Sequence, residues 1–190
     1  MKRRLSKFYA LVDALEQLPS IGKKSALKLA FHIVLGDSMG GLKLAHAIED
    51  AISSLSACKR CGGLSEDELC AICSDELRDS KRLCLVESAK DILIIEESGE
   101  YDGYYFVFDK LDEERIQRLK EAIKENGSEE IIFAFTPSIQ NDALMLYIED
   151  QLKEYDLTFS KIAQGVPTGV HLENIDALSL AKAISERVKL

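Results

Sequence analysis

The chain has 190 residues, of which 46% are hydrophobic and 30% charged, and this composition is ordinary for a folded soluble protein. No apolar run approaches the ~18–20 residues that a membrane span requires. Asp13 and Glu16 interrupt the stretch that would form the apolar core of a secretory signal. We therefore expect a cytoplasmic protein. The net charge of -9 is distributed unevenly along the chain. Residues 1–60 carry ten Lys and Arg against five acidic residues, whereas residues 61–190 carry 14 Lys and Arg against 28 acidic residues. This asymmetry favours one local site for a polyanion.

Three helices are predicted in the first 55 residues. Apolar residues at helical spacing predict the first helix over residues 4–17, and a second runs from about Lys23 to Leu35, where Gly36 ends it. The segment GDSMGG that follows is typical of a turn. A third helix is predicted over residues 42–55, because four apolar residues fall on one of its faces: Leu44, Ile48, Ile52 and Leu55.

Between the first two helices lies a short hairpin, Leu18-Pro19-Ser20-Ile21-Gly22. Its two large apolar residues can insert between the flanking helices, and Gly22 permits a left-handed conformation or the close approach of another backbone. The second helix begins directly afterwards, so its free N–H groups and positive dipole end can bind a phosphate that Lys24 and Lys28 flank. We therefore predict DNA contacts at Ile21, Gly22, Lys23, Lys24 and Lys28. The alternative is a plain helical corner with solvated lysines. The basic tail Lys2-Arg3-Arg4 likewise either contacts DNA or is merely solvated.

Four cysteines form two Cys-x2-Cys pairs, Cys58/Cys61 and Cys70/Cys73, separated by eight residues. Each pair can direct two thiolates at one point, and two pairs complete a tetrahedral zinc site. The segment around them has few large apolar residues, so a metal would hold together what apolar burial cannot. Four protein ligands leave no open position, so we expect one structural Zn2+ per chain; a redox Cys-x2-Cys or disulfides are the alternatives. The fifth cysteine, Cys84, is interpreted as a small buried apolar residue.

From Arg82 onward, short apolar runs alternate with helical stretches. Four strands are predicted at LCLVE (83–87), YYFVF (104–108), IIFAF (131–135) and LTFSKI (157–162). The helices predicted between and after them cover residues 89–97, 112–126, 138–154 and 173–188. Strands that alternate with helices indicate a parallel sheet covered on both faces, so the predicted fold class is α/β with a helical N-terminal region.

Taken together, these segments resemble the RecR family of bacterial recombination mediators. LPSIGKKSALKLAFH is similar to the family's helix–hairpin–helix, the four cysteines to its C4 zinc finger, LCLVE…DILIIEESGEYDGYY to the start of its Toprim domain, and IAQGVPTGVHLENIDALSLAKAI to its C-terminal segment. The resemblance implies a helix–hairpin–helix DNA-binding region at 1–55, a zinc finger at 56–79, a Toprim domain at 80–166 and a C-terminal segment at 167–190.

The resemblance also implies a function, which is recombinational DNA repair without catalysis. The protein would be a sequence-independent DNA-binding clamp, assembled as a homo-oligomer, typically a tetrameric ring able to encircle DNA. It would act with RecO, and with RecF where present, to promote the loading of RecA onto single-stranded DNA. Phosphate binding at the hairpin and zinc ligation by the four cysteines carry over to the residues named above.

Two departures from the family pattern fall at one edge of the Toprim domain. The loop after YYFVF is reduced to DKLD, and after IIFAF the family's Asn-Pro-Thr-Val-Glu-Gly-Glu-like stretch reads Thr136-Pro137-Ser138-Ile139-Gln140-Asn141-Asp142. Gln140 therefore stands where the family has one acidic residue, and the shorter Asp142 stands where the family has the other. These changes suggest a divergent member with a reduced set of partners.

Glu87, at the end of the first predicted strand, raises the question of whether this domain is an enzyme. Catalytic Toprim domains hold divalent metal for phosphoryl transfer with such a glutamate and an Asp-x-Asp pair after a later strand. No Asp-x-Asp follows IIFAF, so we expect no catalysis, and Glu87 either faces DNA or a partner or pairs with a nearby base. A metal-dependent nuclease, primase or topoisomerase-like enzyme and a protein-only adaptor of the repair complex stay open as alternatives.

Overall fold

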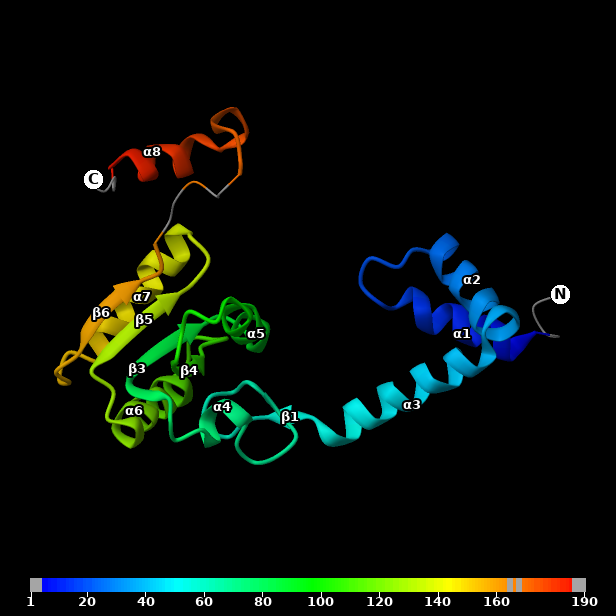
Figure 1. Ribbon diagram of the computed structural model, residues 1–190, viewed down its shortest axis with the longest axis horizontal. Coiled ribbons are helices and arrows are strands. Elements are labelled where there is room, and N and C mark those ends of the chain that lie inside the picture. Colours follow the sequence, from blue (N-terminus) through cyan, green and yellow to red (C-terminus); the bar gives the residue numbers. More distant parts are fainter. Residues whose placement is uncertain (1–4, 164–165, 167–168, 186–190) are drawn as a thin grey trace. The chain divides into compact units, whose positions relative to one another are not determined.

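A computed structural model describes residues 5–163, 166 and 169–185 of the chain (Figure 1). The chain divides into two compact units, a helical unit of residues 1–55 and an α/β unit of residues 56–190. The basic tail Lys2-Arg3-Arg4 lies outside the described residues, as do parts of the expected C-terminal segment.

The helical unit contains α1 (Ser6–Glu16), α2 (Lys23–Phe31), the π-helical turn η2 (His32–Gly36) and α3 (Ser38–Ser54). Its core is small: Val12, Ala26 and Ala30 are buried, and four half-buried residues pack around them, Phe8, Leu11, Leu15 and Ile21. The two alanines leave little side-chain bulk between α1 and α2, so these helices pack closely. The unit therefore depends on few apolar contacts.

The third helix begins earlier than the sequence predicts. Asp37 caps it, because its side chain accepts a hydrogen bond from Gly40 N at 2.8 Å. Gly40 and Gly41 consequently lie inside α3, and the prediction of a turn across GDSMGG is wrong. The second helix does extend to Gly36, but its last turn is π-helical, with Asp37 N donating to His32 O at 2.7 Å.

The apolar residues predicted on one face of the third helix are not covered by the rest of the helical unit. Leu44, Ile48, Ile52 and Leu55 have between 40% and 77% of their surface open to solvent, and α3 contains no buried residue. An apolar helix face of this kind is normally covered.

The α/β unit contains a four-stranded sheet of β3 (Asp79–Val86), β4 (Gly103–Val107), β5 (Glu130–Ala134) and β6 (Thr158–Lys161). The strand order is β4-β3-β5-β6, and every pair is parallel. The connecting helices are α5 (Ala89–Ser98), α6 (Glu113–Asn126) and α7 (Ile139–Gln151). These elements confirm the predicted parallel α/β sheet and its Toprim-like class.

The two faces of this sheet are covered by different parts of the chain. One face packs on α6 and α7, through Leu83, Leu85 and Phe106 of the strands and residues such as Leu119 and Ile148 of the helices. The opposite face packs on α5 and on the cysteine segment, through Cys84, Val86, Tyr105 and Val107. The central strand β3 therefore ends in a continuous apolar run that is buried on both sides.

The cysteine segment consists of a short antiparallel pair, β1 (Ser56–Ala57) and β2 (Leu64–Ser65), followed by α4 (Ala71–Ser74). It is joined to the sheet by hydrogen bonds as well as by packing: Val107 N donates to Cys61 O at 2.8 Å, and the Arg118 guanidinium donates to Lys59 O at 2.8 Å. The segment thus shares the core of the α/β unit.

Beyond the sheet, the described residues include the short helix η3 (Leu172–Asn174) and α8 (Ala177–Ser185). α8 lies within the helix predicted over residues 173–188. None of the described helices is long and apolar enough to cross a membrane.

Candidate metal centre and nucleic-acid interface

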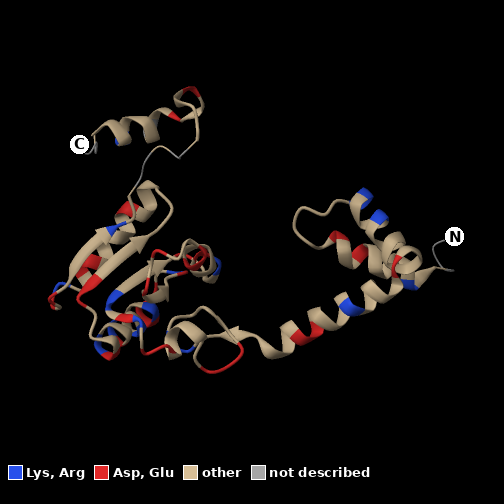
Figure 2. Cartoon of the chain, viewed as in Figure 1, with Lys and Arg blue, Asp and Glu red and all other residues tan. Residues whose placement is uncertain are grey.

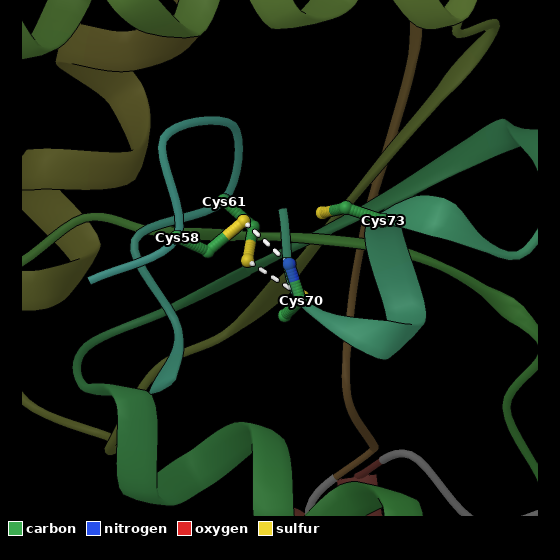
Figure 3. Close-up of side chains that lie close together, drawn as sticks. All are labelled: Cys58, Cys61, Cys70 and Cys73. Carbon is green, nitrogen blue, oxygen red and sulfur yellow. Dashed lines mark hydrogen bonds between the residues drawn. The ribbon is translucent and has the colours of Figure 1, made fainter. Parts of the chain in front are cut away.

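The four predicted zinc ligands converge on one point. Cys58, Cys61, Cys70 and Cys73 are all buried, and their sulfur atoms lie within 4.8 Å of one another (Figure 3). The Sγ atoms of Cys61 and Cys70 are 3.6 Å apart, close to the roughly 3.8 Å that a tetrahedral site with Zn–S bonds of ~2.3 Å requires. Four sulfur donors at this spacing fit one Zn2+ ion.

The backbone of the segment sets the direction of these side chains. Cys58 and Cys61 lie in the loop between β1 and β2, Cys70 precedes α4, and Cys73 lies within it. Two main-chain amides donate to the sulfurs, Gly63 N to Cys61 Sγ at 3.2 Å and Cys70 N to Cys58 Sγ at 3.3 Å. Gly62 has a φ of 79°, and a Cβ there would lie 3.2 Å from Val107 Cβ, so the turn against the sheet requires glycine.

The electrostatics of this cluster favour a bound cation. Hydrogen bonding with Cys70, together with burial, raises the pKa of the Cys61 thiol to about 12, and hydrogen bonds with Cys61 and Cys70 raise the pKa of Cys73. The hydrogen bonds from Cys61 and Cys73 lower the pKa of Cys70, so without a metal the cluster favours one thiolate among protonated thiols. Four thiolates cannot crowd into a buried site without a compensating charge. Because all four positions are taken by protein, zinc here cross-links the chain and leaves no site for substrate. Cys84 is buried nearby, as predicted, and burial raises its pKa to about 12.

The hairpin differs in detail from its predicted form. Ile21 packs into the small core of the helical unit, and its N–H donates to Leu18 O at 3.2 Å. Leu18, expected to insert between the helices, is instead 50% exposed. The left-handed residue is Ser20, with a φ of 64°, whereas Gly22 has an ordinary extended backbone with φ -86° and ψ 167°. The turn is therefore closed at Ser20, and the fold itself does not require glycine at position 22.

Gly22 is the N-cap of α2, and no side chain caps this helix end. A Cβ built at Gly22 would meet no atom within 4 Å, so the space beside this residue, next to the start of the helix, is open. Lys23, Lys24 and Lys28 are exposed, and within the described part of the chain none of them forms an ion pair. Figure 2 shows positively charged residues in blue along α2. An open main-chain donor set beside three free ammonium groups has the chemistry of a phosphate site.

The carboxylate of Glu87 has partners that the sequence does not suggest. Its Oε2 accepts from Thr136 N at 2.6 Å and its Oε1 accepts from Asn141 Nδ2 at 3.0 Å. Within the described residues no basic side chain forms an ion pair with it, so the alternative of pairing with a nearby base has no support there. Desolvation raises the pKa of Glu87, but the hydrogen bonds from Thr136 and Asn141 outweigh it and lower the pKa below its usual value. Among the residues that the structure describes, the four cysteines are the only cluster of three or more metal-ligating side chains.

One polar network of the α/β unit gives no signal in the sequence. Arg78 donates to both carboxylate oxygens of Glu96, at 3.0 and 2.7 Å, and to Gly103 O at 2.9 Å. Tyr105 OH donates to Glu96 at 2.6 Å. The network fastens the stretch after the cysteine segment to α5 and β4, and its members lie far apart along the chain.

Comparison with known proteins gives matches over the whole chain. The family model for the helix-hairpin-helix of RecR matches residues 8–52, and the model for the four-cysteine zinc finger domain of RecR matches residues 55–75. The recombination protein RecR of a Nitratiruptor species is 72% identical over 190 residues, which is the full length of both chains. The protein of the same name from Campylobacter jejuni subsp. doylei is 52% identical over the full length of both. That of a Helicobacter pylori strain is 47% identical over 188 residues, which is 99% of this chain and 97% of the relative.

Proposed function

Because the chain belongs to the RecR family of recombination proteins, we propose that it is a cytoplasmic, non-catalytic, sequence-independent DNA-binding protein of recombinational repair. The observation that carries DNA binding is the start of α2, which no side chain caps and where Gly22 adds no side chain of its own, beside three lysines that form no ion pair within the described residues. One structural Zn2+, held by the four cysteines, stabilises the α/β unit.

The proposed DNA contact is made to phosphate. The N–H groups at the start of α2 would donate to phosphate oxygens, with Gly22 allowing the backbone to approach. Lys24 and Lys28 lie four residues apart on the helix face opposite the buried Ala26 and Ala30. The role of Ile21 is to anchor the hairpin, since its side chain is packed and its N–H is used. Such contacts position a protein on DNA without reading its sequence.

The DNA contact is tested by fluorescence anisotropy with a labelled gapped duplex over a salt series. The Lys24→Glu/Lys28→Glu variant should lose most of the affinity, and the slope of log affinity against log salt should shrink by about 2, because two phosphate contacts are lost. The Lys90→Glu/Lys161→Glu variant makes the same charge change on exposed residues of the α/β unit and should bind much more tightly than the hairpin variant. Binding unchanged by the hairpin variant would overturn the assignment.

The exposed apolar face of α3 supports the proposed assembly into a homo-oligomer, a tetrameric ring. Within the helical unit Ile48 and Ile52 are 51% and 77% exposed, and a second copy could cover them. Sedimentation of the Ile48→Asp/Ile52→Asp variant should show a smaller assembly than the intact protein. An unchanged sedimentation coefficient would place the self-contact elsewhere.

The proposed mediator role, with RecO and where present RecF, is to promote loading of RecA onto single strands coated with single-strand-binding protein. Family membership supports this role, and the hairpin supplies the DNA contact that it needs. Addition of the protein together with RecO should shorten the lag of RecA filament formation on coated strands. When the Lys24→Glu/Lys28→Glu variant replaces the parent protein, the lag should be as long as in a reaction to which neither is added.

Two alternative functions predict different results. A metal-dependent Toprim enzyme would nick or join DNA in Mg2+ and lose that activity in Glu87→Gln; the engagement of Glu87 by Thr136 and Asn141 argues against it. A protein-only adaptor would form a defined oligomer and bind no DNA at any salt concentration.

A further inference from the structure

Glu87 lies at a special point of the sheet. It follows Val86, whose neighbour on β5 is Ala134, so Glu87 and Thr136 stand at the carboxyl ends of two adjacent parallel strands. From β3 the chain goes to β4 on one side and later returns to β5 on the other. The strand order therefore reverses between β3 and β5, and in open α/β sheets the crevice at such a reversal is the usual place for a ligand.

In this chain the crevice holds the protein's own polar groups. Thr136 N donates to Glu87 Oε2 at 2.6 Å, Asn141 Nδ2 donates to Glu87 Oε1 at 3.0 Å, and the same Nδ2 donates to Thr136 O at 2.7 Å. Both hydrogens of the Asn141 amide are thereby used, as are both oxygens of the carboxylate.

We infer that Glu87 and Asn141 are positioning residues that form an internal latch across the ends of β3 and β5. The latch fixes the turn of residues 135–138, and its hydrogen bonds engage the polar groups with which the crevice would otherwise bind a ligand. The inference concerns the α/β unit alone and is independent of the DNA contact proposed at the hairpin.

The remaining groups of the crevice fit this role. Its volume is about 250 Å3, and its other acid, Asp91, is engaged in capping α5, where its carboxylate accepts from Ser88 N at 2.8 Å. On the far side of the turn, Ser138 caps α7 by accepting from Asn141 N at 3.1 Å. Asn141 therefore joins the start of α7 to the strand ends and holds Ile139, which is 85% exposed, in a defined outward position.

The hydrogen bonds give the latch a pH dependence with a definite sign. The pKa of Glu87 is lowered in the folded chain, so the latch is at full strength above the ordinary carboxyl pKa and weakens as the pH falls through the lowered value. A glutamine at position 87 cannot titrate, so the variant Glu87→Gln should lack this dependence.

Amide hydrogen exchange of the intact zinc-loaded protein tests the latch at Thr136. In Asn141→Ala and in Glu87→Ala, the Thr136 amide should exchange about tenfold faster, with the exchange of β3 and β5 unchanged. Gln140→Ala alters the neighbouring exposed residue and should leave Thr136 as in the parent. After correction for intrinsic rates, protection of Thr136 should decline at acid pH in the parent but not in Glu87→Gln.

Two results would overturn the inference. One is Thr136 protection that is unchanged in both Asn141→Ala and Glu87→Ala, because the amide would then have no need of either residue. The other is Mn2+ binding, followed by electron paramagnetic resonance on the parent protein, that disappears in Glu87→Gln. That outcome would make Glu87 a metal ligand and would also revive the enzyme alternative.

Discussion

The arginines packed against the α/β unit and the lysines at the hairpin of the helical unit differ in whether they have partners. In the α/β unit, Arg78 pairs with Glu96, Arg115 pairs with Asp109, and Arg82 bridges Asp79 and Asp102. In the helical unit, Lys23, Lys24 and Lys28 have no partner within the described residues.

The same contrast holds for the main-chain N–H groups of the two units. In the α/β unit, amide groups point inward, at the zinc ligands and at Glu87. At the start of α2, no side chain caps the helix, and a Cβ at Gly22 would meet no atom within 4 Å. The comparison teaches that paired groups hold the α/β unit together, whereas the groups left unpaired in the helical unit are available to bind.

Loss of a zinc ligand should have the largest effect. Structural zinc contributes on the order of 10 kcal/mol in small metal-dependent domains, and the cysteine segment covers one face of the sheet. Cys70→Ala should therefore lose its zinc and lose the cooperative thermal unfolding of the α/β unit, as followed by metal analysis and circular dichroism.

The matched control for this change is Cys84→Ala. This side chain is buried in the same layer but is not a ligand, so the variant should keep one zinc per chain and lose only about 1 kcal/mol. A zinc-free Cys70→Ala protein that unfolds like the parent would show that the α/β unit does not depend on its metal.

Breaking the Arg78 network should have an intermediate effect. Arg78→Ala removes the bidentate partner of Glu96 and a donor to Gly103 O, and should lower the free energy of unfolding by about 2 kcal/mol. Lys81→Ala breaks an ion pair with Glu129 that is exposed on both sides, and should leave the urea midpoint unchanged. Equal midpoints for the two variants would contradict the structural role given to the network.

The smallest effect is expected at the hairpin turn. Ser20 has a φ of 64°, a left-handed conformation that costs a residue with a side chain about 1 kcal/mol. Ser20→Gly should relieve this strain, and the helical unit should become slightly more stable. Amide exchange of α1 and α2 measures the change; faster exchange would show that the strain is absent or compensated.

Local patterns in the sequence predict the elements well. The alternation of apolar runs with helical stretches gives the parallel sheet, and the doubled Cys-x2-Cys spacing gives the metal site. The early start of α3 escapes prediction because a single cap, Asp37, outweighs two glycines. At the hairpin, residue type points to Gly22 as the left-handed residue, but the turn uses Ser20.

The contacts that the sequence does not reveal are tertiary ones. Glu87 and Asn141 are 54 residues apart, and Arg78 and Glu96 are 18 residues apart. No periodicity or spacing marks such pairs, since they meet only when the sheet has assembled. For the same reason, the helical pattern of α3 predicts an apolar face but not that the helical unit leaves it uncovered.

The most direct test of the central claim, that the start of α2 is a phosphate site, is the DNA affinity of Gly22→Ala. The backbone at Gly22 suits alanine, and the new Cβ meets nothing in the chain, so folding should change by no more than about 1 kcal/mol. The methyl group would stand where a phosphate must approach, and affinity for a labelled gapped duplex should fall by about tenfold or more, a loss of roughly 1.4 kcal/mol. A stably folded Gly22→Ala protein that binds the duplex as tightly as the parent would contradict the claim.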